Sequence, residues 1–220
     1  MLARIRDGLD VSSDDSARRA TVAARLKAPK PHLIPGRVAN PGANLPTLLR
    51  TFLEGQSATV VSVATPGDVP SAVTDFLRSS NLPQCVRMGE DPFLAKLDWS
   101  REPTLERQQG RAEANDEVGL SHATAAVAET GTLVLASGHQ NPVTLNFLPE
   151  THIVVLAAKD IVGPYETAFE RMRDAYGRGT IPRTLNLISG PSRTGDIGGK
   201  LVMGAHGPRR MCVIIVEKAD

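Results

Sequence analysis

Residues 58–64 read ATVVSVA and decide the class of fold. The run is rich in β-branched residues, and its continuous apolar character suits a strand buried on both faces of a sheet. Short apolar runs of the same kind recur along the chain. They lie at residues 84–88, 118–120, 132–136, 152–157, 185–189 and 211–217.

Helical patterns separate several of these runs. Asn44 can cap a helix that continues to Glu54 and ends at Gly55. Residues 66–79 begin with a proline and place their apolar side chains on one face, and a third helix follows Pro164 as far as residue 176. Short apolar strands that alternate with helices predict an α/β fold, namely a mostly parallel sheet covered by helices.

The first 42 residues differ from the rest of the chain. Residues 2–28 have a helical composition, and Ser12 or Ser13 can cap the stretch 14–27, which we expect to lie on the body or on a partner. Residues 29–42 read PKPHLIPGRVANPG, typical of an extended connector. We therefore expect a helical extension with a proline-rich connector over residues 1–42, and one α/β domain over residues 43–220.

A charged segment interrupts the alternation of strands and helices. Nine of the twenty residues from Asp98 to Glu117 are charged. The stretch is either a solvated loop or a mobile lid.

Composition excludes several classes of function. The 220 residues carry a formal net charge of only +1, and aromatic residues make up 4% of them, so a nucleic-acid partner is not expected. Apolar runs stay well short of the roughly 18 residues that a membrane span needs, and we expect a cytoplasmic protein without membrane contact.

The cysteines and histidines give no metal or cofactor pattern. Cys85 and Cys212 are read as two buried thiols, with one long-range disulfide as the alternative. The chain contains no CxxC, so it cannot hold a cysteine-ligated iron–sulfur cluster by itself. Its five histidines lack metal-ligand spacing, and we expect no metal site.

The segment ISGPSRTGDI at residues 188–197 is the strongest candidate for a binding site. It follows an apolar strand, and ligands of open α/β sheets bind beyond the carboxyl ends of strands. Arg193 can hold a carboxylate or phosphate, Ser192 and Thr194 can donate to the same anion, and Asp196 can orient the turn. An ordinary strand-to-helix turn remains the alternative. The motifs for a nucleophile elbow, a P-loop and a dinucleotide fingerprint do not match, so the cofactor stays unknown.

Two further glycine turns carry candidate chemistry. Glu129, in AETGT at residues 128–132, can act as a base or nucleophile, or can clamp the turn structurally. His206, in GAHGPRR at residues 204–210, lies between two glycines and is either catalytic or a turn residue with a structural hydrogen bond. We expect both to be catalytic and to meet Arg193 at one edge of the sheet. The expected ligand-binding residues are Thr130, Gly131, Thr132, Gly190, Ser192, Arg193, Thr194, Asp196, Gly207 and Arg209.

Four blocks in this order resemble the lactate-utilisation protein C (LutC/YkgG-type) family, the stand-alone LUD domain. They are AETGTLVL at 128–135, LP at 148–149 with HIVV at 152–155, SGPSRT at 189–194, and GAHGPRR at 204–210. The resemblance covers roughly residues 45–217. It departs at Gly198-Gly199, where family members often carry an acidic residue, and this glycine pair disfavours a regular helix after Asp196.

The resemblance implies both a fold and a function. It implies a fold similar to glucosamine-phosphate isomerase, ribose-phosphate isomerase and CoA transferases. It also implies a role beside iron–sulfur-containing lactate-utilisation partners in oxidising L-lactate to pyruvate. We therefore expect a non-iron–sulfur subunit that binds a small carboxylate or phosphate.

Two alternatives remain at this point. The first is an independent transferase or isomerase acting on a CoA thioester or sugar phosphate, because Glu129-x-Gly131 resembles the catalytic glutamate turn of CoA transferases. The second is a purely structural adaptor without catalysis.

Overall fold

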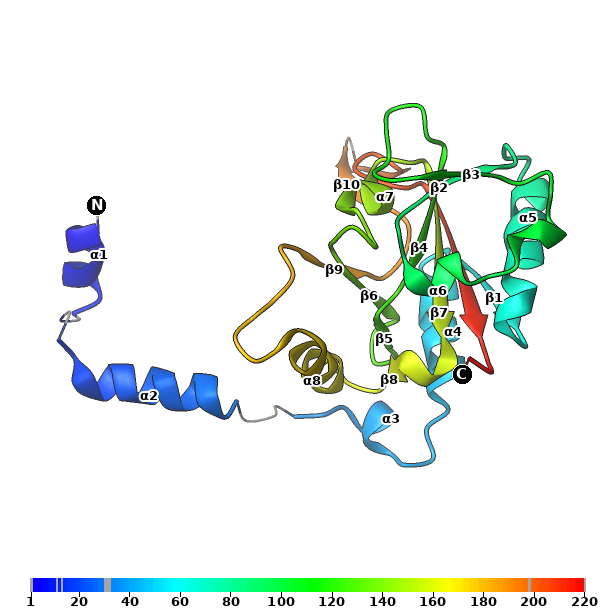
Figure 1. Ribbon diagram of the computed structural model, residues 1–220. Coiled ribbons are helices and arrows are strands. Elements are labelled where there is room, and N and C mark those ends of the chain that lie inside the picture. Colours follow the sequence, from blue (N-terminus) through cyan, green and yellow to red (C-terminus); the bar gives the residue numbers. More distant parts are fainter. Residues whose placement is uncertain (1, 11, 13, 30–32, 198, 220) are drawn as a thin grey trace. The chain divides into compact units, whose positions relative to one another are not determined.

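The computed structural model describes residues 2–10, 12, 14–29, 33–197 and 199–219 of the chain (Figure 1). It separates into two units, Met1–Ile34 and Pro35–Asp220, which we describe individually. No helix within the described residues has the length and apolar character needed to cross a membrane.

The first unit contains two helices rather than one. They are α1 (Leu2–Gly8) and α2 (Ser16–Lys27). Asp15 caps α2 by accepting a hydrogen bond from the Arg18 amide at 2.8 Å, so the prediction of Ser12 as cap was wrong, and Ser13 lies outside the described residues. An ionised carboxylate at a helix start also interacts favourably with the helix dipole.

The second unit is built on a six-stranded sheet in which every pair of neighbouring strands is parallel, as the apolar runs predict. Its order is β1-β12-β7-β4-β2-β3. The strands are β1 (Thr59–Val63), β2 (Cys85–Met88), β3 (Glu106–Gln109), β4 (Val118–His122), β7 (Thr151–Ala157) and β12 (Arg210–Val216).

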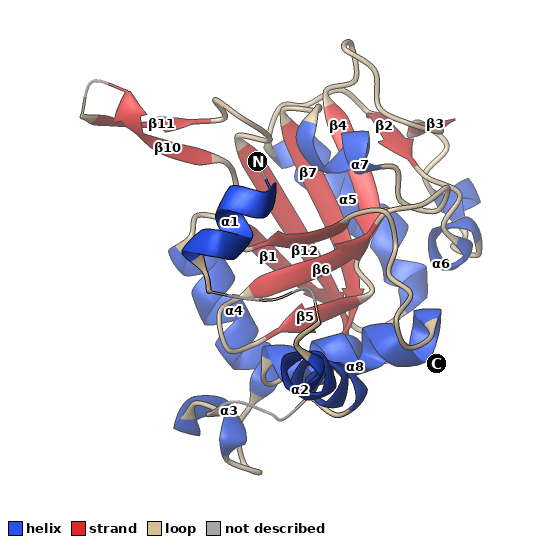
Figure 2. Ribbon diagram, turned by 90° about the vertical axis from the view of Figure 1, so that its left-hand side faces the viewer, coloured by secondary structure: helices blue, strands red, loops and turns tan. Residues whose placement is uncertain are grey.

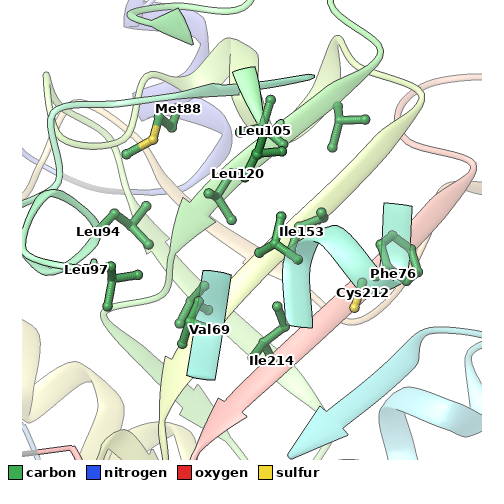
Figure 3. Close-up of a cluster of buried hydrophobic side chains, with 14 of the residues drawn as sticks. Val69, Phe76, Met88, Leu94, Leu97, Leu105, Leu120, Ile153, Cys212 and Ile214 are labelled. Atoms are coloured by element: carbon green, nitrogen blue, oxygen red, sulfur yellow. The ribbon is translucent and has the colours of Figure 1, made fainter. Parts of the chain in front are cut away.

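Both faces of the central strands are buried, which explains their continuous apolar runs. At the edge of the sheet, β1 has Thr59 and Ser62 exposed, so the prediction that residues 58–64 are buried on both faces was wrong. On β12, Cys212 and Ile214 join one hydrophobic cluster, whereas Val213 and Ile215 join another on the opposite face. Successive side chains of a strand point to opposite faces, so a strand covered on both sides needs apolar residues at every position. Figure 3 shows the first cluster, where Phe76 of the covering helix packs near β12.

Helices and short helical turns accompany the strands. The α-helices are α3 (Gly36–Ala39), α4 (Leu45–Gly55), α5 (Val69–Ser79), α6 (Pro92–Ala95), α7 (Val143–Phe147) and α8 (Tyr165–Tyr176). The 3-10 turns are η1 (Pro66–Asp68), η2 (Trp99–Arg101) and η3 (Ala158–Asp160). The helix α3 lies inside the segment that we expected to be an extended connector.

A second sheet, which the sequence did not predict, covers part of one face of the first. Its order is β8-β5-β6-β9, from the strands β5 (Ala125–Val127), β6 (Thr132–Ala136), β8 (Ile161–Val162) and β9 (Leu185–Ile188). The β6 strand is antiparallel to β5 and β9. The helix α8 packs on β5 and β8 rather than on the parallel sheet. Residues 132–136 and 185–188 are thus strands, as expected, but they do not belong to the parallel sheet (Figure 2).

Two segments form strands although they contain no long apolar run. The charged segment 98–117 contains the edge strand β3, whose side chains are mostly exposed, so the expectation of a loop or lid was wrong there. Beyond Arg193 the chain forms a hairpin from β10 (Arg193–Ile197) and β11 (Lys200–Met203), which projects from the domain in Figure 2. Within the described residues after Asp196 the chain forms strands and no helix, in agreement with the low helix propensity of the glycine pair.

The cysteines are both free thiols, so the alternative of a long-range disulfide was wrong. Cys212 is fully buried on β12, and burial raises the pKa of its thiol to about 12. Cys85 on β2 is only half-buried.

Asn44 caps α4 as the sequence predicts, because its Oδ1 accepts a hydrogen bond from the Thr47 amide at 3.1 Å. Replacing Asn44 by alanine is expected to lower the free energy of unfolding by about 1 kcal/mol, the usual value of an N-cap. Urea denaturation followed by circular dichroism measures this loss. Asn44→Asp retains an acceptor and is the control; equal destabilisation by both variants contradicts the capping role.

Candidate functional site

Two of the three predicted loops meet at one pocket. The Ser192 amide donates to the Pro208 carbonyl at 2.8 Å, and the Gly204 amide donates to the Ser192 carbonyl at 2.9 Å. The Ser192 hydroxyl also accepts a hydrogen bond from the His206 amide at 3.3 Å. These contacts hold the Ser192 and His206 loops together across fourteen residues of sequence.

The pocket between these loops has a volume of about 290 Å³. Its wall combines polar groups with apolar side chains. The lining residues are Asn146, Phe147, Leu187, Ile188, Ser189, Gly190, Ser192, Arg193, His206, Gly207, Pro208 and Met211.

The position of the pocket corrects the expectation that the site lies beyond the carboxyl ends of the parallel strands. Pro208 and Met211 flank the amino end of β12, and the carboxyl end that contributes is that of β9 in the second sheet. The prediction differs from the structure because β9, which leads into the Ser192 loop, pairs antiparallel with β6 in the second sheet and is not a strand of the parallel sheet.

Arg193 is held by the end of α4. Its guanidinium donates to Gln56 Oε1 at 3.3 Å and to the Ser57 hydroxyl at 2.5 Å. Among the described residues Arg193 has no carboxylate partner, so its positive charge is not neutralised by an ion pair. Gly190 lies against the same helix end, where an added Cβ would stand 2.8 Å from Gln56 Cβ.

Four hydroxyl groups form a cluster beside the pocket. Thr132 Oγ1 lies 2.7 Å from Ser189 Oγ and 2.9 Å from the Tyr165 hydroxyl. Thr130 Oγ1 lies 2.7 Å from Thr132 Oγ1 and 2.9 Å from the same tyrosine. Through Ser189 the cluster joins the pocket to the turn that carries Glu129. Sequence reasoning missed Ser189 and Tyr165 because single hydroxyl residues carry no distinctive pattern.

The Glu129 turn is the third predicted loop. The Glu129 amide donates to the Gly163 carbonyl at 3.1 Å, and its carbonyl accepts from Arg37 Nε at 3.1 Å. Gly131 has a φ of +69°, and its Cα packs against Phe52 of α4. Glu129 itself does not line the pocket described above.

The remaining predicted residues lie around the rim or away from it. Gly207 lines the pocket and packs against Ser192 and Phe147. Thr194 is buried in the hairpin opposite Val202. The Arg209 guanidinium lies 3.7 Å from the Glu150 carboxylate, with both side chains exposed. The side chain of Asp196 lies outside the described residues.

A buried polar chain leads from the pocket into the core. Asn146 Oδ1 lies 3.4 Å from the Ser121 hydroxyl, which lies 3.0 Å from His152 Nε2. All three residues are at most 1% exposed. Complete burial lowers the pKa of His152 to about 3, so the ring is neutral at physiological pH. In the sequence, the residues of this hydrogen-bonded chain stand out only as single polar residues within otherwise apolar runs.

Together the fold and the pocket define an α/β domain with a parallel sheet, a second sheet packed on it and a two-stranded hairpin, and with a small, partly polar pocket where two loops meet. Residues 39–216 match the LUD domain model, and the chain belongs to this family. This confirms the family resemblance derived from the four sequence blocks.

Curated relatives carry the name lactate utilization protein C. The protein of that name from Shouchella clausii is 34% identical over 101 residues, which are 46% of this chain and 44% of the relative. Its counterpart from Anoxybacillus flavithermus is 28% identical over 172 residues, or 76% of this chain and 74% of that protein. The chain spans less than half of the length of the Shouchella clausii protein and of a second relative with the same name.

A solved structure supports the fold. The crystal structure of a DUF162 family protein from Deinococcus radiodurans aligns with a TM-score of 0.59 at 23% identity. The alignment covers 79% of this chain and 97% of that chain. The α/β architecture with a mostly parallel sheet is therefore shared with a solved protein.

Proposed function

We propose that this protein takes part in lactate utilisation and binds a small carboxylate, of the lactate and pyruvate class, in the pocket between the Ser192 and His206 loops. The observation that carries the proposal is the convergence at one pocket of an arginine without a carboxylate partner among the described residues, two serine hydroxyl groups and an asparagine side-chain amide. The names of the relatives support the choice of lactate over other small anions.

The size of the pocket favours a ligand of few atoms. Its volume of about 290 Å³ lies at the lower end of the roughly 300–1,000 Å³ that ligand pockets usually have. Arg193 can pair with a carboxylate, while Phe147 and Met211 offer apolar surface to a methyl group. A three-carbon acid combines these two features.

The chemistry of lactate oxidation assigns a role to one further residue. Oxidation of L-lactate to pyruvate releases two electrons and two protons: one proton comes from C2 and leaves to solvent, and the other comes from the hydroxyl group. His206 lines the pocket and can accept that proton, whereas Glu129 lies on the neighbouring turn. We propose that the two electrons pass to an iron–sulfur-containing partner protein, since this sequence has no CxxC motif.

Arg193→Ala tests the binding site. We expect the variant to bind L-lactate and pyruvate about tenfold more weakly, because a charge-assisted contact is lost at an exposed position. Isothermal titration with both acids measures the effect. The matched control is Arg183→Ala, an exposed arginine that does not line the pocket.

Three outcomes would contradict the proposal. Equal affinity of both variants for pyruvate would remove Arg193 from the site. Wild-type protein that binds neither acid would instead favour a structural adaptor. A covalent adduct at Glu129 after incubation with acyl-CoA would favour the transferase alternative.

A further inference from the structure

The chain Asn146–Ser121–His152 connects the proposed binding pocket to the core of the domain. Asn146 lies on α7, Ser121 on β4 and His152 at the start of β7. Asn146 lines the pocket, and among the described residues its Nδ2 is buried without a hydrogen-bond partner. A buried donor without a partner is destabilising, so its retention calls for an explanation.

The direction of the hydrogen bonds follows from His152. The ring is neutral, so only one of its nitrogens carries a proton. Nδ1 is buried without a partner among the described residues, whereas Nε2 lies 3.0 Å from the Ser121 hydroxyl. A buried N–H without an acceptor costs more than a buried lone pair, so the proton belongs on Nε2. His152 therefore donates to Ser121.

The rest of the chain then has one arrangement. Because the Ser121 oxygen accepts from His152, its own proton is free to donate to Asn146 Oδ1, 3.4 Å away. This hydrogen bond orients the Asn146 carboxamide with its Oδ1 toward the core. Asn146 lines the pocket, and its NH₂ group is the part that has no hydrogen-bond partner among the described residues.

We propose that Asn146 is a ligand-binding residue that donates an N–H to an acceptor oxygen of the bound acid, and that Ser121 and His152 are positioning residues that set the direction of this amide. The proposal rests on the carboxylate pocket of the proposed function and deepens it. It makes the pocket selective for groups that only accept hydrogen bonds at this position, such as a carboxylate or a keto oxygen. An amide or ammonium group there would leave two donors facing each other.

Asn146→Asp tests the donor directly, since aspartate has the same shape but replaces the NH₂ group by a negatively charged acceptor. We expect pyruvate to bind at least tenfold more weakly to this variant, the loss of a hydrogen bond to a charged group. Lactamide, an uncharged analogue of lactate with an NH₂ group, is expected to bind wild-type protein more weakly than L-lactate. Titration calorimetry measures all of these affinities.

His152→Gln and His152→Leu test the positioning role. The glutamine amide can place an N–H near the position of Nε2, so His152→Gln is expected to retain its affinity for pyruvate. Leucine cannot donate to Ser121, so His152→Leu is expected to bind pyruvate several-fold more weakly. A merely structural role of His152 predicts the opposite pattern, because leucine suits the apolar surroundings better than glutamine.

A second measurement on the wild-type protein keeps the test decisive if a variant fails to fold. The side-chain amide signals of Asn146 in a ¹⁵N-labelled sample are expected to shift on addition of pyruvate. Pyruvate binding that is lost in Arg193→Ala but leaves the Asn146 signals unchanged overturns the role of Asn146 while the proposed function stands. A wild-type protein that binds no pyruvate overturns the proposed function itself.

Discussion

Replacing Gly131 by alanine is expected to lower the free energy of unfolding by about 3 kcal/mol or more. Gly131 has a φ of +69°, a conformation that costs an L-residue about 1–2 kcal/mol. An added Cβ would also overlap the Cβ of Phe52 and lie 3.2 Å from the Leu53 amide nitrogen. Overpacking of this kind typically costs a further 1–3 kcal/mol, because a buried helix has to move.

The control for this prediction separates backbone strain from the steric clash. Gly199 has a similar φ of +72°, but an added Cβ would meet no atom within 4 Å. Gly199→Ala is therefore expected to cost only about 1 kcal/mol. Urea denaturation of both variants measures the two losses. Equal losses would show that α4 tolerates the extra methyl group, and would contradict the packing argument.

Replacing Asp91 by alanine has the second largest expected effect, about 3 kcal/mol. Asp91 caps α6 by accepting from the amides of Phe93 at 2.9 Å and Leu94 at 3.0 Å. Its other oxygen lies 3.3 Å from His122 Nδ1, and the His122 Nε2 is already buried without a partner among the described residues. The variant loses the helix cap, which lowers the free energy of unfolding by about 1–2 kcal/mol. It also leaves His122 Nδ1 without its carboxylate partner, which lowers the free energy of unfolding by about a further 1–3 kcal/mol.

The contribution of Asp91 is expected to depend on pH. Burial raises the pKa of this carboxyl, but the hydrogen bond and charge of His122 and the two amide hydrogen bonds outweigh burial, so the pKa lies below the ordinary value of 3.8. A lowered pKa means that the folded state binds the proton less readily than the unfolded state. The stabilisation is therefore complete above pH values near 3.8 and is lost as the pH falls through the lower, folded-state pKa.

Asp91→Asn isolates the charge, since it keeps an acceptor for the helix cap. Its free energy of unfolding is expected to converge with that of wild type at low pH and to lie below it at neutral pH. Thermal or urea denaturation between pH 2 and pH 7 measures this difference. A gap between the two proteins that stays constant over this range would contradict an ionised Asp91 in the folded state.

The sequence determined the elements whose signals are local. The apolar runs at 152–157 and 211–217 became the central strands β7 and β12, because a strand buried on both faces has to be apolar throughout. The run at 58–64 became the edge strand β1, which is only partly buried. Asn44 marked the start of α4 for an equally local reason, since a helix cap involves residues three positions apart. The four sequence blocks also indicated the family to which the chain belongs.

Only the tertiary structure decided which of these elements meet. The second sheet arises because β6 and β9 pair antiparallel over about fifty residues of sequence, and this pairing puts the Ser192 loop at the amino end of β12. The same pairing leaves Glu129 on the turn before β6, beside the pocket and not among its lining residues. The contacts between Asn146, Ser121 and His152 span 25 and 31 residues of sequence. Hydrogen-bond direction in such a chain depends on burial and on partners distant along the chain, neither of which a local sequence pattern records.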